Sequence, residues 1–126
     1  SNDSSTASVR GSLVPGYLNS ATGNSNYGWF DGGTTTTRVN RIDFSNDSST
    51  ASVRGPLSSV RYYKAATGNS NYGWFGGGQN FISPTDVVRS LVDRIDFSND
   101  SVQASSRGLL SISRTGLSAT SNTPIG

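Results

Sequence analysis

An internal repeat constrains this chain more than any other feature of its sequence. Residues 1–11 read SNDSSTASVRG, which recurs unchanged at 45–55 and, in the diverged form SNDSVQASSRG, at 98–108. Two identical copies of ATGNSNYGWF lie between these strings, at 21–30 and 66–75. Repeats of this period are typical of solenoids and propellers, in which each repeat forms one supersecondary unit. We therefore expect successive copies of one small unit.

Each unit contains four short apolar stretches separated by turn residues. In the first unit these are LVPGYLNSA, NYGWF, a stretch ending in RIDF, and TASVR. Asn, Gly, Ser and Asp dominate the breaks, as in tight turns, and runs this rich in Val, Tyr, Trp, Phe and Thr predict strands. Alternation in the third stretch of the second unit predicts two faces, with Asp93, Ile95 and Phe97 on one and Val92, Arg94 and Asp96 on the other.

The composition supports an all-β fold. The ten cations include a single lysine, all eight acidic residues are aspartates, and strong formers of surface helices are therefore almost absent. Only 32% of the residues are hydrophobic, which is compatible with disorder. The regular spacing of the aromatic residues, together with a net charge of only +2, favours a folded chain instead.

The second unit resembles a kelch repeat. It reads RYYKAATGNSNYGWFGGG, then VDRIDFSND, then ASSRG, and glycine pairs follow the aromatic strand at Gly32–Gly33 and Gly77–Gly78. The resemblance implies a β-propeller with four-stranded blades. The tryptophan usual on the fourth strand is replaced by small residues such as Ala51 and Val53, which suggests the broad kelch-like group. The near-identity of the repeats is similar to phage and metagenomic tail-associated proteins, or to a designed sequence, and the former would place the protein in a virion or outside the cell.

Aligning the repeats divides one domain, residues 1–126, into about two and a half blades. The parts are an outer strand of a split blade (1–11), two full blades (12–55 and 56–108) and an inner strand of a split blade (109–126). Such a set cannot close by itself, and open blade faces normally mark association sites. We expect a ring closed by oligomerisation, most simply a homodimer. A fragment of a longer propeller is the alternative.

The residue types present argue against catalysis. The chain has no His, Cys or Glu, which removes most general bases, thiol nucleophiles and zinc sites. Asp43 and Asp96 offer the two carboxylates of a glycosidase, but they occupy equivalent repeat positions. We interpret them as structural residues that cap the following turn and pair with Arg41 and Arg94. The protein is expected to be no enzyme and to need no cofactor or metal.

Two further loop types have simple structural interpretations. The SND turns, with Asp3, Asp47 and Asp100, present too few carboxylates for a calcium loop, so Asx turns are favoured. The glycine pairs match neither GxxxxGKS/T nor a GxGxxG between strand and helix. They are expected to let the backbone turn tightly.

Two sets of residues are candidates for contact with a ligand or partner. Trp29 and Trp74, with the aromatic residues beside them, either pack between blades or stack on sugars. The segment 79–91 is the longest insertion between the repeats, and loops on rigid scaffolds often bind partners. Its apolar residues are Phe81, Ile82, Pro84, Val87 and Val88.

The sequence therefore predicts a self-assembling scaffold, with a carbohydrate- or protein-binding module of lectin type as the alternative. The partner is expected to be the chain itself, with a glycan or another protein as further candidates. The nine arginines are scattered, not clustered, so no nucleic-acid partner is expected. No apolar run is long enough to span a membrane.

Overall fold

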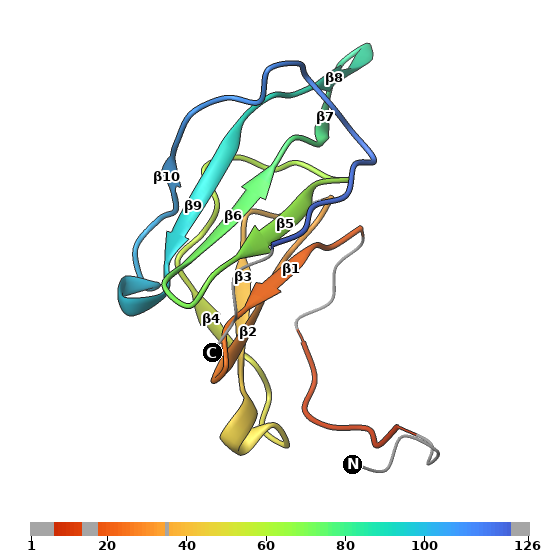
Figure 1. The fold of residues 1–126 in the computed structure, drawn as a ribbon. Helices are drawn as coiled ribbons and strands as arrows, with labels where there is room; N and C mark the ends of the chain where they lie inside the picture. Colours follow the sequence, from red (N-terminus) through yellow and green to blue (C-terminus); the bar gives the residue numbers. More distant parts are fainter. Residues whose placement is uncertain (1–6, 14–17, 35, 122–126) are drawn as a thin grey trace.

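The computed structural model describes residues 7–13, 18–34 and 36–121, which form two four-stranded antiparallel sheets and a hairpin (Figure 1). The first sheet has the order β1 (Ala21–Gly23), β2 (Tyr27–Asp31), β3 (Val39–Asp43), β4 (Ser52–Arg54). The second has the order β10 (Ser105–Ser106), β9 (Val92–Asp96), β6 (Tyr72–Gly76), β5 (Ala65–Gly68). The hairpin pairs β7 (Gln79–Ile82) with β8 (Thr85–Val88). These elements confirm an all-β fold with four-stranded sheets.

Helical structure in the described ranges is limited to two short 3-10 turns, η1 (Phe44–Asn46) and η2 (Phe97–Asn99). Among the described residues, no helix is long and apolar enough to cross a membrane.

The repeated sequence produces the same local structure twice. Asn24 and Asn69 begin the turns between the first two strands of each sheet, and each side-chain oxygen accepts hydrogen bonds from two backbone N–H groups two and three residues later, at 2.8–2.9 Å. This Asx geometry is what makes asparagine effective at turns. The register is also repeated, because Trp29 pairs with Arg41 and Trp74 pairs with Arg94.

The core lies where the two sheets meet. Trp29 and Val39 of the first sheet are fully buried against Phe75 and Ile95 of the second, and β1 runs beside β5 (Figure 1). The ring of Phe97 stacks on Trp29, with centroids 3.9 Å apart and planes 6° from parallel. Stacking at this distance contributes about 0.5–1.5 kcal/mol beyond the area buried.

The alternation predicted for the third strand is confirmed in β9. Asp93 and Ile95 are buried, whereas Val92, Arg94 and Asp96 are only partly covered. The small residue Gly73 allows the close approach of the first sheet, because a Cβ there would lie 2.5 Å from the methyl group of Thr22.

Three parts of the chain differ from the sequence-based expectation. Segment 79–91 was expected to be a loop and instead contains the β7–β8 hairpin, which projects beyond the second sheet (Figure 1). The outer strand expected at 1–11 and the inner strand expected at 109–126 do not form within their described parts, 7–11 and 109–121. The physical reason is that the backbone hydrogen bonds described for both segments go to residues outside strands, such as Asp47 for Gly11 and Ser90 for Leu110, so no continuous ladder forms.

The C-terminal segment nevertheless follows the path that its repeat alignment indicates. Leu110 N–H donates to the carbonyl of Ser90 at 2.8 Å, just as Leu57 N–H donates to Thr37 at 2.9 Å one repeat earlier. Both acceptors lie two residues before the third strand of a sheet. Leu110 thus meets the second sheet at the position where Leu57 meets the first.

Candidate functional site

The carboxylate of Asp100 is the polar centre of the contact between the sheets. It follows η2 of the second unit and accepts hydrogen bonds from three side chains of the first sheet. Trp29 Nε1 donates at 2.8 Å, Arg41 Nη1 at 3.1 Å, and Arg54 Nε and Nη2 at 2.9 and 2.6 Å. The side chain of Asp100 is only 4% exposed. We call these four residues the Asp100 site.

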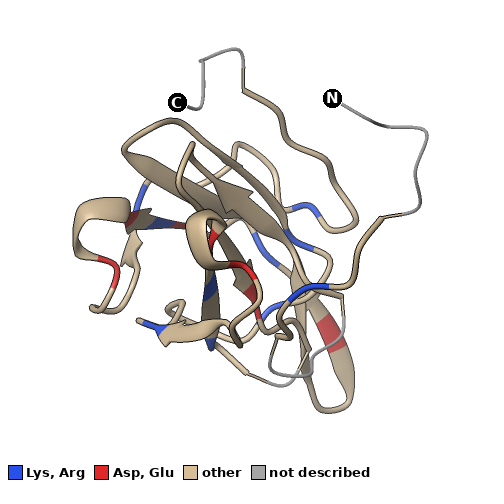
Figure 2. Ribbon diagram, turned by 90° about the horizontal axis from the view of Figure 1, so that it is seen from below, with Lys and Arg blue, Asp and Glu red and all other residues tan. Residues whose placement is uncertain are grey.

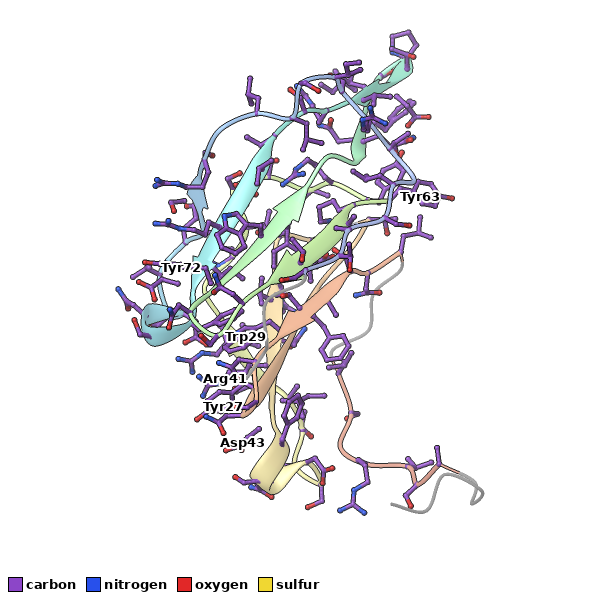
Figure 3. All side chains as sticks on the ribbon, viewed as in Figure 1. Tyr27, Trp29, Arg41, Asp43, Tyr63 and Tyr72 are labelled. Atoms are coloured by element: carbon purple, nitrogen blue, oxygen red, sulfur yellow. The ribbon has the colours of Figure 1, made fainter. Side chains whose placement is uncertain are left out.

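The site holds its aspartate in the charged form. Burial acts to raise the pKa of Asp100, but the hydrogen bonds from Arg54 and Trp29 and the charges of Arg41 and Arg54 outweigh it, so the pKa lies below its ordinary value. Arg41 is itself held in place by the ring of Tyr27, 4.2 Å below its guanidinium carbon. Figure 3 shows Tyr27, Trp29 and Arg41 together on β2 and β3.

This lowered pKa predicts a loss of stability in acid. A carboxyl group whose pKa falls on folding stabilises the protein above its unfolded pKa of about 3.9 and ceases to do so as the pH falls through the folded value. The urea midpoint should therefore be level near neutral pH and fall steeply below about pH 4. Asp100→Asn should show a shallower fall over the same range. An equally steep fall in the variant would contradict the role assigned to Asp100.

The second sheet repeats the three donor residues of the Asp100 site, but no described aspartate binds them. Trp74, Arg94 and Arg107 occupy the repeat positions of Trp29, Arg41 and Arg54. Arg94 lies over the ring of Tyr72 at 4.2 Å, which reproduces the contact of Arg41. Trp74 is half-buried, Arg107 is exposed, and among the described residues no hydrogen bond or ion pair reaches any of these three side chains. We call these three residues the open receptor.

The first unit repeats the turn that carries Asp100, but among the described residues this copy of the turn does not contact a set of donors like that of the Asp100 site. Asp47 occupies the repeat position of Asp100 and pairs only with Arg10 among the described residues, at 3.1 Å. The two side chains are 42% and 54% exposed, and the ring of Phe44, which corresponds to Phe97, is 52% exposed. Asp3, at the same repeat position, lies outside the described residues.

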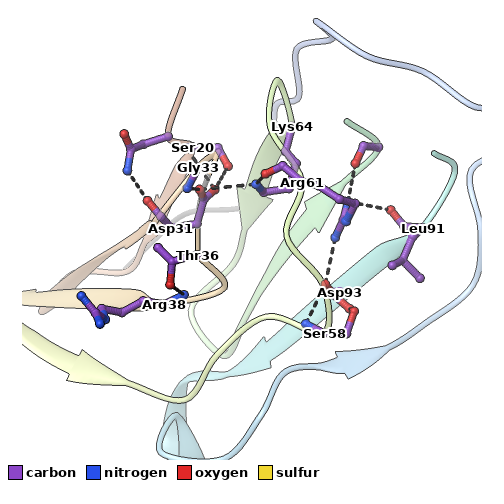
Figure 4. Close-up of polar contacts among 12 residues, drawn as sticks. Ser20, Asp31, Gly33, Thr36, Arg38, Ser58, Arg61, Lys64, Leu91 and Asp93 are labelled. Carbon is purple, nitrogen blue, oxygen red and sulfur yellow. Dashed lines mark hydrogen bonds and ion pairs between the residues drawn. The ribbon is translucent and has the colours of Figure 1, made fainter. Parts of the chain in front are cut away.

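Two buried ion pairs hold the neighbouring parts of the fold (Figure 4). Arg61 Nη2 lies 2.8 Å from Asp93 Oδ2, with both side chains fully buried, and Ser58 Oγ donates to the same carboxylate at 2.6 Å. Lys64 Nζ lies 3.4 Å from Asp31 Oδ1. Burial lowers the pKa of Lys64, although Asp31 opposes that shift. Each buried carboxylate therefore has a cation beside it.

Asp43 and Asp96 cap the 3-10 turns, as the sequence indicates. Asp43 accepts from the N–H and hydroxyl of Ser45 at 2.9 and 2.6 Å, and Asp96 accepts from Ser98 in the same way. These bonds lower the pKa of both carboxyl groups.

The expected pairing of these aspartates with the neighbouring arginines is wrong. Arg41 extends to Asp100 and Arg94 lies over Tyr72, while the two aspartates bond to the serines of the following turns, Ser45 and Ser98. The Asx-type bond of each FSND turn is likewise made by Asp43 and Asp96, not by Asp47 and Asp100.

The glycine pairs have the structural role expected of them. Gly33, Gly77 and Gly78 have φ values of 68°, 69° and 90°, in the left-handed region that favours glycine. A Cβ on Gly32 would lie 2.2 Å from the methyl group of Thr36.

The predicted contact residues divide into exposed and buried ones. The hairpin presents Phe81, Ile82, Pro84 and Val88 to solvent, with Val87 half-buried. Trp29 was a candidate for contact with a ligand, and the structure instead buries it fully in the core, where it cannot reach a ligand in solution. Figure 2 shows basic and acidic segments interspersed over both sheets.

Comparison with known proteins yields a fold likeness. No protein-family model matches the chain, and no curated protein matches its sequence. The structure is similar to a solved one entitled "Structure of YjhT", with a TM-score of 0.68 and 15% sequence identity over 82% of this chain. The matched region is 35% of that chain, so this protein spans about a third of its structural neighbour's length.

Proposed function

We propose that the protein is a non-enzymatic, self-assembling scaffold in which the two sheets are kelch-like propeller blades. The observation that carries the proposal is the open receptor, a surface whose counterpart within the chain packs against another sheet. Trp29 of that counterpart is fully buried, whereas Trp74 of the open receptor is half-buried. The likeness to a longer solved chain supports a fold that extends beyond two sheets. Copies of the chain would then close a ring, with a dimer as the simplest form.

The solution mass measured by light scattering over a range of concentrations tests this function. We expect the mass to rise with concentration from the 13.2 kDa of one chain toward twice that value. A mass that stays at 13.2 kDa up to the highest soluble concentration would exclude the scaffold.

A binding module for glycans or another protein is the second candidate. The partly exposed rings of Tyr72 and Trp74, which lie 5.8 Å apart on one face, favour it, because such rings also stack on sugars. Saturable thermal stabilisation by one sugar of a panel, lost in Trp74→Ala, would promote this function over assembly. A melting temperature that no sugar of the panel raises, together with the increase in mass, would exclude a glycan-binding function.

A further inference from the structure

We propose that the open receptor binds the Phe44–Asp47 turn of a second copy, so that copies join head to tail through Asp47. This inference rests on the proposed self-assembly and names the surfaces that carry it. The Asp100 site within the chain shows how such a contact is built. Its donor residues are repeated in the second sheet as the open receptor, and its aspartate-bearing turn is repeated in the first unit as Phe44–Asp47.

The receptor side is preorganised for a carboxylate. Trp74 and Arg94 have the strand register of Trp29 and Arg41, and both arginines lie 4.2 Å from the tyrosine ring beneath them. The Nε atoms of Arg41 and Arg94 are both buried without a hydrogen-bond partner in the described structure, and Arg41 reaches Asp100 through Nη1, so the terminal nitrogens of Arg94 are the ones available to a carboxylate. Arginines held in place present fixed donors to carboxylates. Among the described residues neither Arg94 nor Arg107 forms a salt bridge, and the lowered pKa of Asp96 comes mainly from its hydrogen bonds with Ser98, with only a weak contribution from the charge of Arg94.

The turn side supplies the matching groups. Phe44 rests on Gly28 of the neighbouring strand as Phe97 rests on Gly73, and one side of the ring remains exposed. In the internal contact, Phe97 stacks on Trp29 while Asp100 receives the indole N–H. A second copy in the same arrangement stacks its Phe44 on Trp74 and places Asp47 between Trp74, Arg94 and Arg107. The two surfaces are therefore opposite in charge, with Asp47 on one and Arg94 and Arg107 on the other.

One exchange accompanies this docking. Gly11 N–H donates to the carbonyl of Asp47, as Gly55 N–H donates to that of Asp100, at 2.6 and 2.7 Å. Arg107–Gly108 of the first copy would occupy the place that Arg10–Gly11 holds on the second, because both pairs align with Arg54–Gly55. The displaced segment, residues 7–13, contains no strand, and its pair Arg10–Asp47 is exposed. Exposed pairs are weak, whereas the receptor offers Asp47 donors from three side chains, which docking of the second copy would cover.

The two surfaces are different, so the junction is heterologous. Such contacts build rings when the rotation between copies closes, and open filaments when it does not. The same turn and receptor are used once at every junction.

Sedimentation equilibrium of the full chain with matched variants tests the inference. Asp47→Asn and Arg107→Ala should each weaken association at least about 30-fold, the effect of truncating one partner of a buried charge pair. Arg10→Ala is the matched control, being the same substitution at an equivalent repeat position. It should leave association unchanged or strengthen it, since Arg10 gives way. All three side chains are at least partly exposed, and urea midpoints close to that of the unaltered chain will show that the variants fold.

A mixing experiment separates the two sides of the junction. Asp47→Asn keeps an intact receptor and Arg107→Ala keeps an intact turn, so their equimolar mixture should associate more tightly than either variant alone. Association of Asp47→Asn equal to that of the unaltered chain would overturn this junction while leaving self-assembly standing. Loss in Arg10→Ala as large as in Arg107→Ala, or a mixture no tighter than its parts, would also overturn it. A chain that is monomeric throughout would overturn both proposals.

Discussion

Asp100→Asn is expected to lower the free energy of unfolding by about 2–4 kcal/mol, because Arg41 and Arg54 lose their common anion and an NH2 group replaces one of the two acceptor oxygens. The carboxylate is 4% exposed, which favours a large effect, whereas the two arginines are 22% and 26% exposed and retain some access to water. The expected loss therefore lies below the full cost of an isolated buried charge. Since domains of this size are stable by only about 5–15 kcal/mol, urea unfolding will resolve it clearly.

The control for this variant is Asp47→Asn, which makes the same substitution at the equivalent repeat position. Within the described part of the chain the Asp47 side chain has one partner, the exposed Arg10, so its loss should cost no more than about 1 kcal/mol at concentrations where the chain is monomeric. If both variants lowered the free energy of unfolding equally, the hydrogen bonds of Asp100 to the first sheet would not be the source of the loss in Asp100→Asn.

The second large effect is expected at the buried pair of Arg61 and Asp93. Asp93→Ala leaves a fully buried guanidinium without its anion, and should cost about 3–5 kcal/mol. The equivalent residue of the first sheet is Asn40, whose side-chain oxygen is buried without a hydrogen-bond partner in the described structure. Asn40→Ala should therefore cost no more than about 1 kcal/mol, since it removes an oxygen that makes no bond.

A double variant distinguishes the loss of charge compensation from the loss of packing. If the loss in Asp93→Ala comes from the uncompensated charge, then Arg61→Met with Asp93→Leu should recover most of it, because an apolar pair needs no hydrogen bonds. A double variant as unstable as Asp93→Ala would point to packing instead. Guanidinium or urea unfolding followed by tryptophan fluorescence measures all four proteins.

The local structure was predictable because it depends on residues close in sequence. The strands β2 and β6 follow from NYGWF, and the caps at Asp43 and Asp96 follow from the FSND turns. The hairpin of segment 79–91 was missed, although TDVV at β8 is rich in strand-forming residues. The segment differs in length and sequence between the two repeats, and such variability does not indicate whether an insertion pairs with itself.

The Asp100 site was not predictable in the same way. Its hydrogen bonds join residues 46–71 positions apart, across two sheets. The only signal was the recurrence of an aspartate and an arginine in each SND…RG string, and no local rule says that the arginine of one string contacts the aspartate of the next. Arg54 and Arg107 were therefore missed as functional residues.

The different environments of Trp29 and Trp74 show the limit most clearly. Both lie in the identical string ATGNSNYGWF, yet Trp29 is fully buried and Trp74 is half-buried. Strand alternation puts both indoles on the same face, but only the arrangement of the sheets determines which face is covered. That arrangement is a tertiary property that identical local sequences cannot encode.

The most direct measurement uses the indole N–H signals, since the chain contains only two tryptophans. In nitrogen-correlated NMR spectra, the Trp29 signal should be independent of concentration and protected from hydrogen exchange, because its N–H donates to Asp100 in the core. The Trp74 signal should move and become protected as the chain associates, and should stay unprotected in Asp47→Asn. A Trp74 indole that keeps its free-chain shift and exchange rate where the mass has doubled would contradict the account.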